Sequence, residues 1–181
     1  MLIAVVFYPR LDDPRLRDFR RSYDPTADLI EPHLTLVFPV PGSPEALSEH
    51  VRKVVTHVEP FDLHIAGLKK TWDHWMYLAI REGSEVVVAL HEELYGTSLA
   101  EHRRLDLTFE PHIGIGFFGL GDYDPLDPTE IRLDEATYST ARVRAEELAI
   151  DEWRRVGELT IVRLADDLTV FEDIDQIPLG P

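Results

Sequence analysis

Apolar side chains alternate with other residues in the same way in two separate segments of the chain, 32–38 (PHLTLVF) and 111–117 (PHIGIGF). In an extended strand, neighbouring side chains point to opposite faces. Each segment therefore has one fully apolar face and presents a histidine from the other, His33 in the first segment and His112 in the second. The pattern predicts two similar strands, each buried on one side.

The rest of the chain divides into helices and strands by the same reasoning. Apolar residues at helical spacing after Ser43-Pro44 predict a helix that ends before Pro60. Further helices are predicted over 13–23, 84–95 and 129–145, with a turn over 69–73 and a loop over 122–128. The other predicted strands cover 2–8, 61–65, 75–80, 148–153, 158–164 and 168–177.

Each predicted histidine strand is followed by a helix and then by two strands. This repeated order favours a duplicated α+β fold, with antiparallel sheets lining a central cleft and the helices outside. We expect residues 1–181 to form a single bilobal domain in which each half supplies one histidine strand.

Composition narrows the class of protein. The 181 residues include no cysteine, which excludes disulfides, zinc–thiolate sites and a cysteine nucleophile. The apolar run at 2–8 is too short to span a membrane and has no basic flank before it, so we expect a cytoplasmic protein with no membrane partner. The formal net charge of −16 disfavours binding to an extended nucleic acid duplex. Basic residues cluster locally at 10–21, 52–53, 69–70 and 103–104.

With these motifs in place, the chain resembles the two-histidine (2H) phosphoesterase superfamily, in particular its 2'-5' RNA ligase and cyclic phosphodiesterase group. The resemblance rests on both histidine motifs and on the order of elements over nearly the whole length. It implies His33 and His112 as the catalytic pair, Thr35 as a hydroxyl that binds phosphate, and no metal or other cofactor. The substrates that it implies carry a 2',3'-cyclic phosphate or a 2'-5' linkage, as a nucleotide or an RNA end.

The chain departs from the family pattern at Gly114, where a threonine or serine is expected. One hydrogen bond to phosphate is lost there, and a bond to a charged group is worth about 1.5–3 kcal/mol. The glycine indicates either a weakened site or one adapted to a close backbone approach or a bulkier ligand. We take Gly114 to belong to the substrate site in both cases.

Two imidazoles suit this chemistry without a metal. One histidine removes a proton from the attacking water while the other protonates the departing ribose oxygen, and the reverse reaction would join RNA ends. The sequence does not assign the two roles. The alternative functions are a weakly active or non-catalytic protein that binds nucleotide or phosphate at the same site, and an interaction domain without a ligand.

Aromatic residues near the motifs offer surfaces on which a base could stack. The candidates are Tyr8, Trp72, Trp75 and Tyr77, although core packing is the more common role of such side chains, and Trp72 in its predicted turn is the least core-like. The other six histidines show no metal-type spacing. We expect a monomer.

Overall fold

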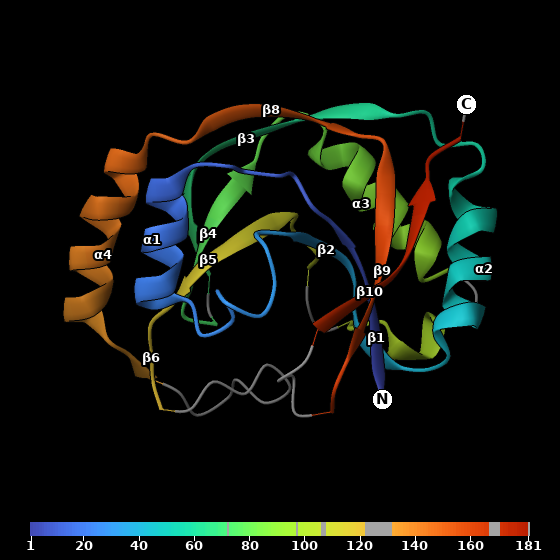
Figure 1. The fold of residues 1–181 in the computed structure, drawn as a ribbon, viewed down its shortest axis with the longest axis horizontal. Coiled ribbons are helices and arrows are strands. Elements are labelled where there is room, and N and C mark those ends of the chain that lie inside the picture. The colour runs from blue at the N-terminus through green and yellow to red at the C-terminus, as the bar shows by residue number, and fades with distance from the viewer. Residues whose placement is uncertain (72, 97, 106–107, 122–131, 167–170, 181) are drawn as a thin grey trace.

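The computed structural model describes every residue except 72, 97, 106–107, 122–131, 167–170 and 181 (Figure 1). The strands are β1 (Leu2–Phe7), β2 (Leu34–Pro41), β3 (Phe61–Lys70), β4 (Trp75–Ile80), β5 (His112–Phe117), β6 (Gly119–Leu120), β7 (Arg132–Leu133), β8 (Asp151–Val156), β9 (Glu158–Leu164) and β10 (Phe171–Pro178). The helices are α1 (Pro14–Tyr23), α2 (Pro44–Val55), α3 (Ser84–Leu94) and α4 (Glu135–Leu148), with a short 3-10 turn at Ala100–His102. The α+β class predicted from the sequence is confirmed.

The main sheet is antiparallel and brings the two histidine strands together at its centre. Its strand order is β10-β9-β1-β2-β5-β4-β3-β8, and β6 and β7 form a separate ribbon. The order divides into two four-stranded halves, one ending in β2 and the other in β5. A single registered pair, Leu34 with Ile113, joins these halves. The two antiparallel sheets expected from the repeat are therefore halves of one sheet.

This sheet is strongly curled. Strands β8 and β9 are separated only by Gly157 in the chain, yet they lie six places apart in the strand order. So short a connection requires the β8 edge of one half to bend round toward β9 in the other half. Figure 1 shows this return, with β8 crossing the top of the molecule before β9 descends.

The helices pack on one face of the sheet. That face carries Leu34, Leu36, Ile113 and Ile115, which are 1% exposed or less. These residues share one buried cluster with side chains from all four helices, including Leu16, Leu47, Leu90 and Ala145. Helices α1 and α4 lie side by side beneath one half, and α2 and α3 beneath the other (Figure 1). The opposite face, which carries the histidines, is left free of these helices.

Three predicted boundaries are wrong. Helix α4 begins at Glu135 rather than 129, because Asp134 caps it and the preceding Arg132–Leu133 pairs as β7 with β6. The strand predicted at 148–153 begins at Asp151, because α4 continues to Leu148. The turn predicted at 69–73 begins later, because β3 continues to Lys70 through an irregularity at Gly67, where φ is 79°. The predicted loop at 122–128 lies outside the described residues.

Candidate active site

The paired register of β2 and β5 places both histidines on one face. Leu34 faces Ile113 across the two strands, and both side chains point into the core. Continuing this antiparallel register by one residue in each direction places His33 opposite Gly114 and Thr35 opposite His112. The histidines are thus diagonal neighbours, roughly 7–8 Å apart at the backbone. We call the surface formed by Tyr8, His33, Thr35, Tyr77, His112 and Gly114 the histidine face.

Each imidazole is oriented by its own main chain. The His33 Nδ1 lies 2.9 Å from the carbonyl oxygen of Glu31, and the His112 Nδ1 lies 2.6 Å from that of Glu110. A carbonyl oxygen only accepts hydrogen bonds, so each Nδ1 carries a proton, and in the neutral ring each Nε2 keeps its lone pair. The repeated segment is therefore Glu-Pro-His, and the glutamate before each proline extends the motif seen in the sequence.

Burial lowers the pKa of both imidazoles. For His112 the pKa falls to about 4, although the nearby Asp73 carboxylate raises it and the Lys69 ammonium lowers it further. The pKa of His33 is also lowered, chiefly by burial, with smaller contributions from the positive charge of Arg20 and from His112 itself. Both rings are therefore neutral at pH 7, in the same tautomer.

A network of polar side chains surrounds His112. The Tyr77 ring packs against the imidazole with centroids 3.9 Å apart. The hydroxyls of Tyr77 and Thr71 both donate to the Asp73 carboxylate. Lys69 forms an ion pair with the Glu110 carboxylate, while the carbonyl of Glu110 holds the imidazole. Glu110 thus contacts Lys69 through its carboxylate and His112 through its carbonyl group.

His33 is supported by a buried ion pair instead. Arg20 on α1 contacts Asp24 at 2.7 Å and also donates to the carbonyl of Ile30 at 2.9 Å. Asp24 in turn accepts hydrogen bonds from the backbone and hydroxyl of Thr26. These contacts fasten the segment that leads into His33 to the first helix.

The space above Gly114 is occupied by a tryptophan. A Cβ atom at position 114 would lie 3.2 Å from two ring carbons of Trp75. That ring packs against Tyr77, which is nearly parallel to it with centroids 6.2 Å apart, and against Phe117 with centroids 5.7 Å apart. Position 114 therefore lacks a hydroxyl, and the Trp75 ring packs in the space that a larger side chain at this position would take.

The predicted aromatic residues have separate outcomes. Tyr8 lies beside His33, with ring centroids 6.3 Å apart in an edge-on arrangement, and its hydroxyl donates to Asp173 at 2.9 Å. Trp72 lies outside the described residues.

Thr35 is half-buried and pairs with Val6 of β1. Sequence reasoning missed a specific place for Lys69 at this site, although the basic pair at 69–70 was visible.

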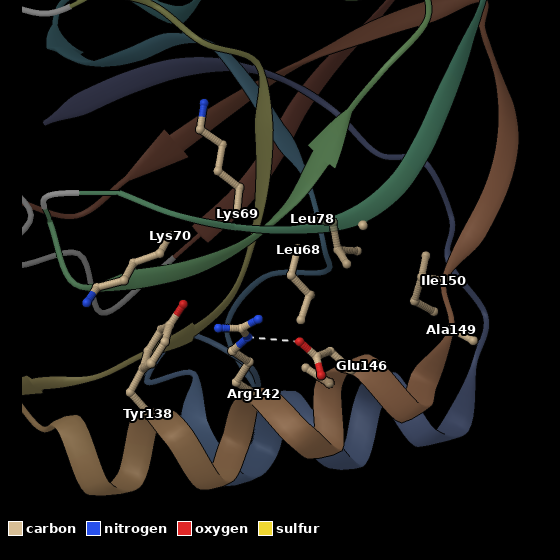
Figure 2. A pocket seen from close by; sticks show the side chains of 11 residues that line it. Leu68, Lys69, Lys70, Leu78, Tyr138, Arg142, Glu146, Ala149 and Ile150 are labelled. Carbon is tan, nitrogen blue, oxygen red and sulfur yellow. Dashed lines mark hydrogen bonds and ion pairs between the residues drawn. The ribbon is translucent and has the colours of Figure 1, made fainter.

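A hollow of about 450 Å³ lies on the other side of β3, against α4 (Figure 2). Leu68 points toward α4 there, whereas the Lys69 side chain points away from the helix. The pairing of Lys69 with Tyr77 agrees with this view, because it places both side chains on the histidine face. Lys69 therefore belongs to the surroundings of His112.

Among the residues that the structure describes, no group of three or more histidine, aspartate or glutamate side chains is arranged to hold a metal ion. In the same residues, no helix is long and apolar enough to cross a membrane.

Residues 8–157 match the model of the 2'-5' RNA ligase superfamily. A Bacillus cereus (strain G9842) protein, named provisionally as a phosphoesterase, is 29% identical over 133 residues, which cover 70% of this chain and 75% of that protein.

Solved structures share the fold. The structure of LigT from E. coli complexed with NADP+ has a TM-score of 0.60 at 15% identity, covering 99% of this chain and 98% of that one. TT0787 of Thermus thermophilus has a TM-score of 0.56 at 16% identity, covering 99% of both chains. Usb1 of Kluyveromyces marxianus with uridine monophosphate has a TM-score of 0.52 at 10% identity, covering 98% of both chains.

Proposed function

Since the chain belongs to the 2'-5' RNA ligase superfamily, we propose that it is a metal-independent phosphoesterase that opens 2',3'-cyclic phosphates on nucleotides or RNA ends. His33 and His112 are its acid–base pair. The supporting observation is that two neutral imidazoles on one face each have Nδ1 bound to a carbonyl, which leaves both Nε2 atoms for the substrate.

Hydrolysis requires that one proton be removed from the attacking water and that another be delivered to the departing ribose oxygen. One Nε2 removes a proton from water, whose oxygen attacks phosphorus, and the bond from phosphorus to one ribose oxygen breaks. The other histidine, protonated at Nε2, gives its proton to that oxygen. Because negative charge favours the protonated imidazole, binding of the anionic phosphodiester between the rings raises their pKa and helps to supply the acid.

We assign two groups to the nonbridging oxygens of the phosphate. Thr35 presents a hydroxyl opposite His112 on the first strand. Lys69 supplies positive charge beside the second strand, and we assign it the role of the hydroxyl that Gly114 lacks. Its ion pair with Glu110 is partly exposed, so exchange of the carboxylate for a phosphate oxygen requires little desolvation.

Gly114 also supports a second candidate. If the hydroxyl is essential for turnover, the same face binds a nucleotide or phosphate without reacting with it. Turnover separates this binding function from the phosphoesterase function. The reverse joining of a cyclic phosphate end to a 5'-hydroxyl would use the same two histidines.

The test is hydrolysis of adenosine 2',3'-cyclic phosphate by the purified protein, with and without a chelator. We expect turnover in both conditions, and we expect His33→Asn and His112→Asn each to lower kcat by about 10²–10⁴-fold. His57→Asn is the matched control, because His57 is exposed and, among the described residues, has its hydrogen bond with Glu93 alone. Loss of turnover on chelation, with recovery on adding a divalent ion, would contradict the proposal.

A further inference from the structure

A second hollow lies where the curled sheet returns on itself. It has a volume of about 470 Å³ and lies between the end of β1 and the connection from β8 to β9. Tyr8, Arg10, Arg154, Arg155, Thr160 and Gln176 are among the residues that line it, and we call it the seam hollow. Binding sites for small molecules commonly have volumes of about 300–1,000 Å³. The seam hollow is therefore large enough for one nucleotide unit.

Three arginines gather at this hollow on a chain whose net charge is −16. Arg154 is fixed by its Nε, which donates to the carbonyl of Pro9 at 3.0 Å, and by its Nη1, which contacts Glu152 at 2.8 Å. Neither of these bonds uses Nη2. Arg155 contacts Asp62 at 3.3 Å, with both side chains more than half exposed. Such a pair contributes little stability, so a phosphate competes with it readily.

Arg10 is the least compensated of the three. Within the described part of the chain, no hydrogen bond or ion pair engages its guanidinium. Its backbone also lies in the left-handed region, with φ at 51°, a conformation that costs a residue with a side chain about 1–2 kcal/mol. Strained backbone positions cluster at active sites and ligand clamps, and a guanidinium is well suited to bind phosphate. Arg10 is therefore the candidate for the ligand contact at this hollow.

Tyr8 connects the seam hollow to the histidine pair. It lines the hollow, and its ring contacts that of His33. When the cyclic phosphate of a substrate lies at the histidines, the next nucleotide of that substrate is therefore within reach of the hollow, past the Tyr8 ring. We propose that the seam hollow binds the nucleotide on the 5' side of the one that carries the cyclic phosphate in an RNA strand, with the phosphodiester between the two nucleotides on Arg10. This inference rests on the proposed function.

The proposal predicts a preference for longer substrates. The test compares kcat/KM for adenosine 2',3'-cyclic phosphate with kcat/KM for the dinucleotide adenylyl-adenosine 2',3'-cyclic phosphate. We expect the dinucleotide to be preferred by about 10- to 150-fold, which corresponds to one hydrogen bond to a charged group. Arg10→Ala should remove most of that preference, mainly through KM. Arg17→Ala is the matched control, because Arg17 is exposed on α1, away from the hollow.

A second variant separates binding from folding. Arg10→Gly removes the guanidinium and also relieves the left-handed backbone, so it should lose the preference while unfolding at the same temperature as wild type or above. Equal kcat/KM for the two substrates in wild type, or a preference unchanged in both Arg10 variants, would overturn the proposal.

A binding measurement distinguishes failure of this inference from failure of the proposed function. By calorimetry, the 3'-phosphorylated dinucleotide should bind more tightly than 3'-AMP, and Arg10→Ala should abolish the difference. If neither cyclic phosphate is turned over, the proposed function is wrong, yet tighter dinucleotide binding through Arg10 would still support the seam hollow. Equal affinities for the two ligands would exclude it.

Discussion

Gly114 and Trp75 together determine the shape of the second histidine motif. The glycine removes a hydroxyl from the second motif, and the tryptophan ring fills the space that the hydroxyl's side chain would take. Because Trp75 is only 8% exposed and packs against two other aromatic rings, it has little room to move away from position 114. The structure thus favours a site built around the glycine over one that has merely lost a side chain.

We expect Gly114→Thr to lower kcat/KM on a cyclic phosphate and to lower the free energy of unfolding by about 1–3 kcal/mol, the usual cost of overpacking. Gly114→Ala separates the two effects, because it adds the crowding Cβ without a hydroxyl. Steady-state kinetics and denaturant unfolding of both variants provide the measurement. A threonine variant more active than both wild type and the alanine variant would show that the site is simply missing its hydroxyl.

The low pKa values of the two histidines set the pH range of activity. Productive free enzyme has one protonated and one neutral imidazole, so kcat/KM follows a bell-shaped curve bounded by the two pKa values. Burial lowers both, to about 4 for His112, and the bell should therefore lie below pH 6.5. The kcat profile should lie at higher pH, because bound phosphate raises both values. A kcat/KM maximum above pH 7 would contradict the assigned pair.

At the scale of elements, the helix boundaries are fixed by local caps. Asp134 begins α4 by accepting from the backbone of Thr137 at 3.1 Å. Ala149 ends the helix in a left-handed conformation, with φ at 50° and ψ at 43°. Glycine is the residue usually found at such a helix end, because it has no Cβ to clash with the following carbonyl.

Ala149→Gly should therefore stabilise the protein by about 0.5–1 kcal/mol, despite the greater flexibility of glycine in the unfolded chain. The matched control is Ser139→Gly, at an exposed position inside the same helix, which should destabilise by about 0.5 kcal/mol. Thermal unfolding of the two variants beside wild type provides the measurement. Destabilisation by both glycines would show that the helix end is not strained.

At the scale of the whole molecule, the repeated motif predicts the fold class and, in each of the two strands, an apolar face with a histidine on the opposite face. It predicts two sheets that line a cleft, whereas β2 and β5 are neighbours in one sheet. Strand alternation is a local rule, so it can be read from the chain. The curl of the sheet, the ion pair of Lys69 and the gathering of arginines at the seam hollow depend on residues far apart in sequence. Their approach is set by tertiary packing, which no local pattern encodes.

The single registered pair between β2 and β5 has a consequence for how such a protein changes its substrate. So short a junction cannot by itself hold the two imidazoles at a fixed spacing. The continuous core beneath both halves must do so, because interiors are close-packed and transmit small changes in volume. Selection for a larger or smaller reacting group would then act on buried aliphatic residues that never meet the ligand, and relatives with identical surface chemistry could differ in preference through their interiors alone.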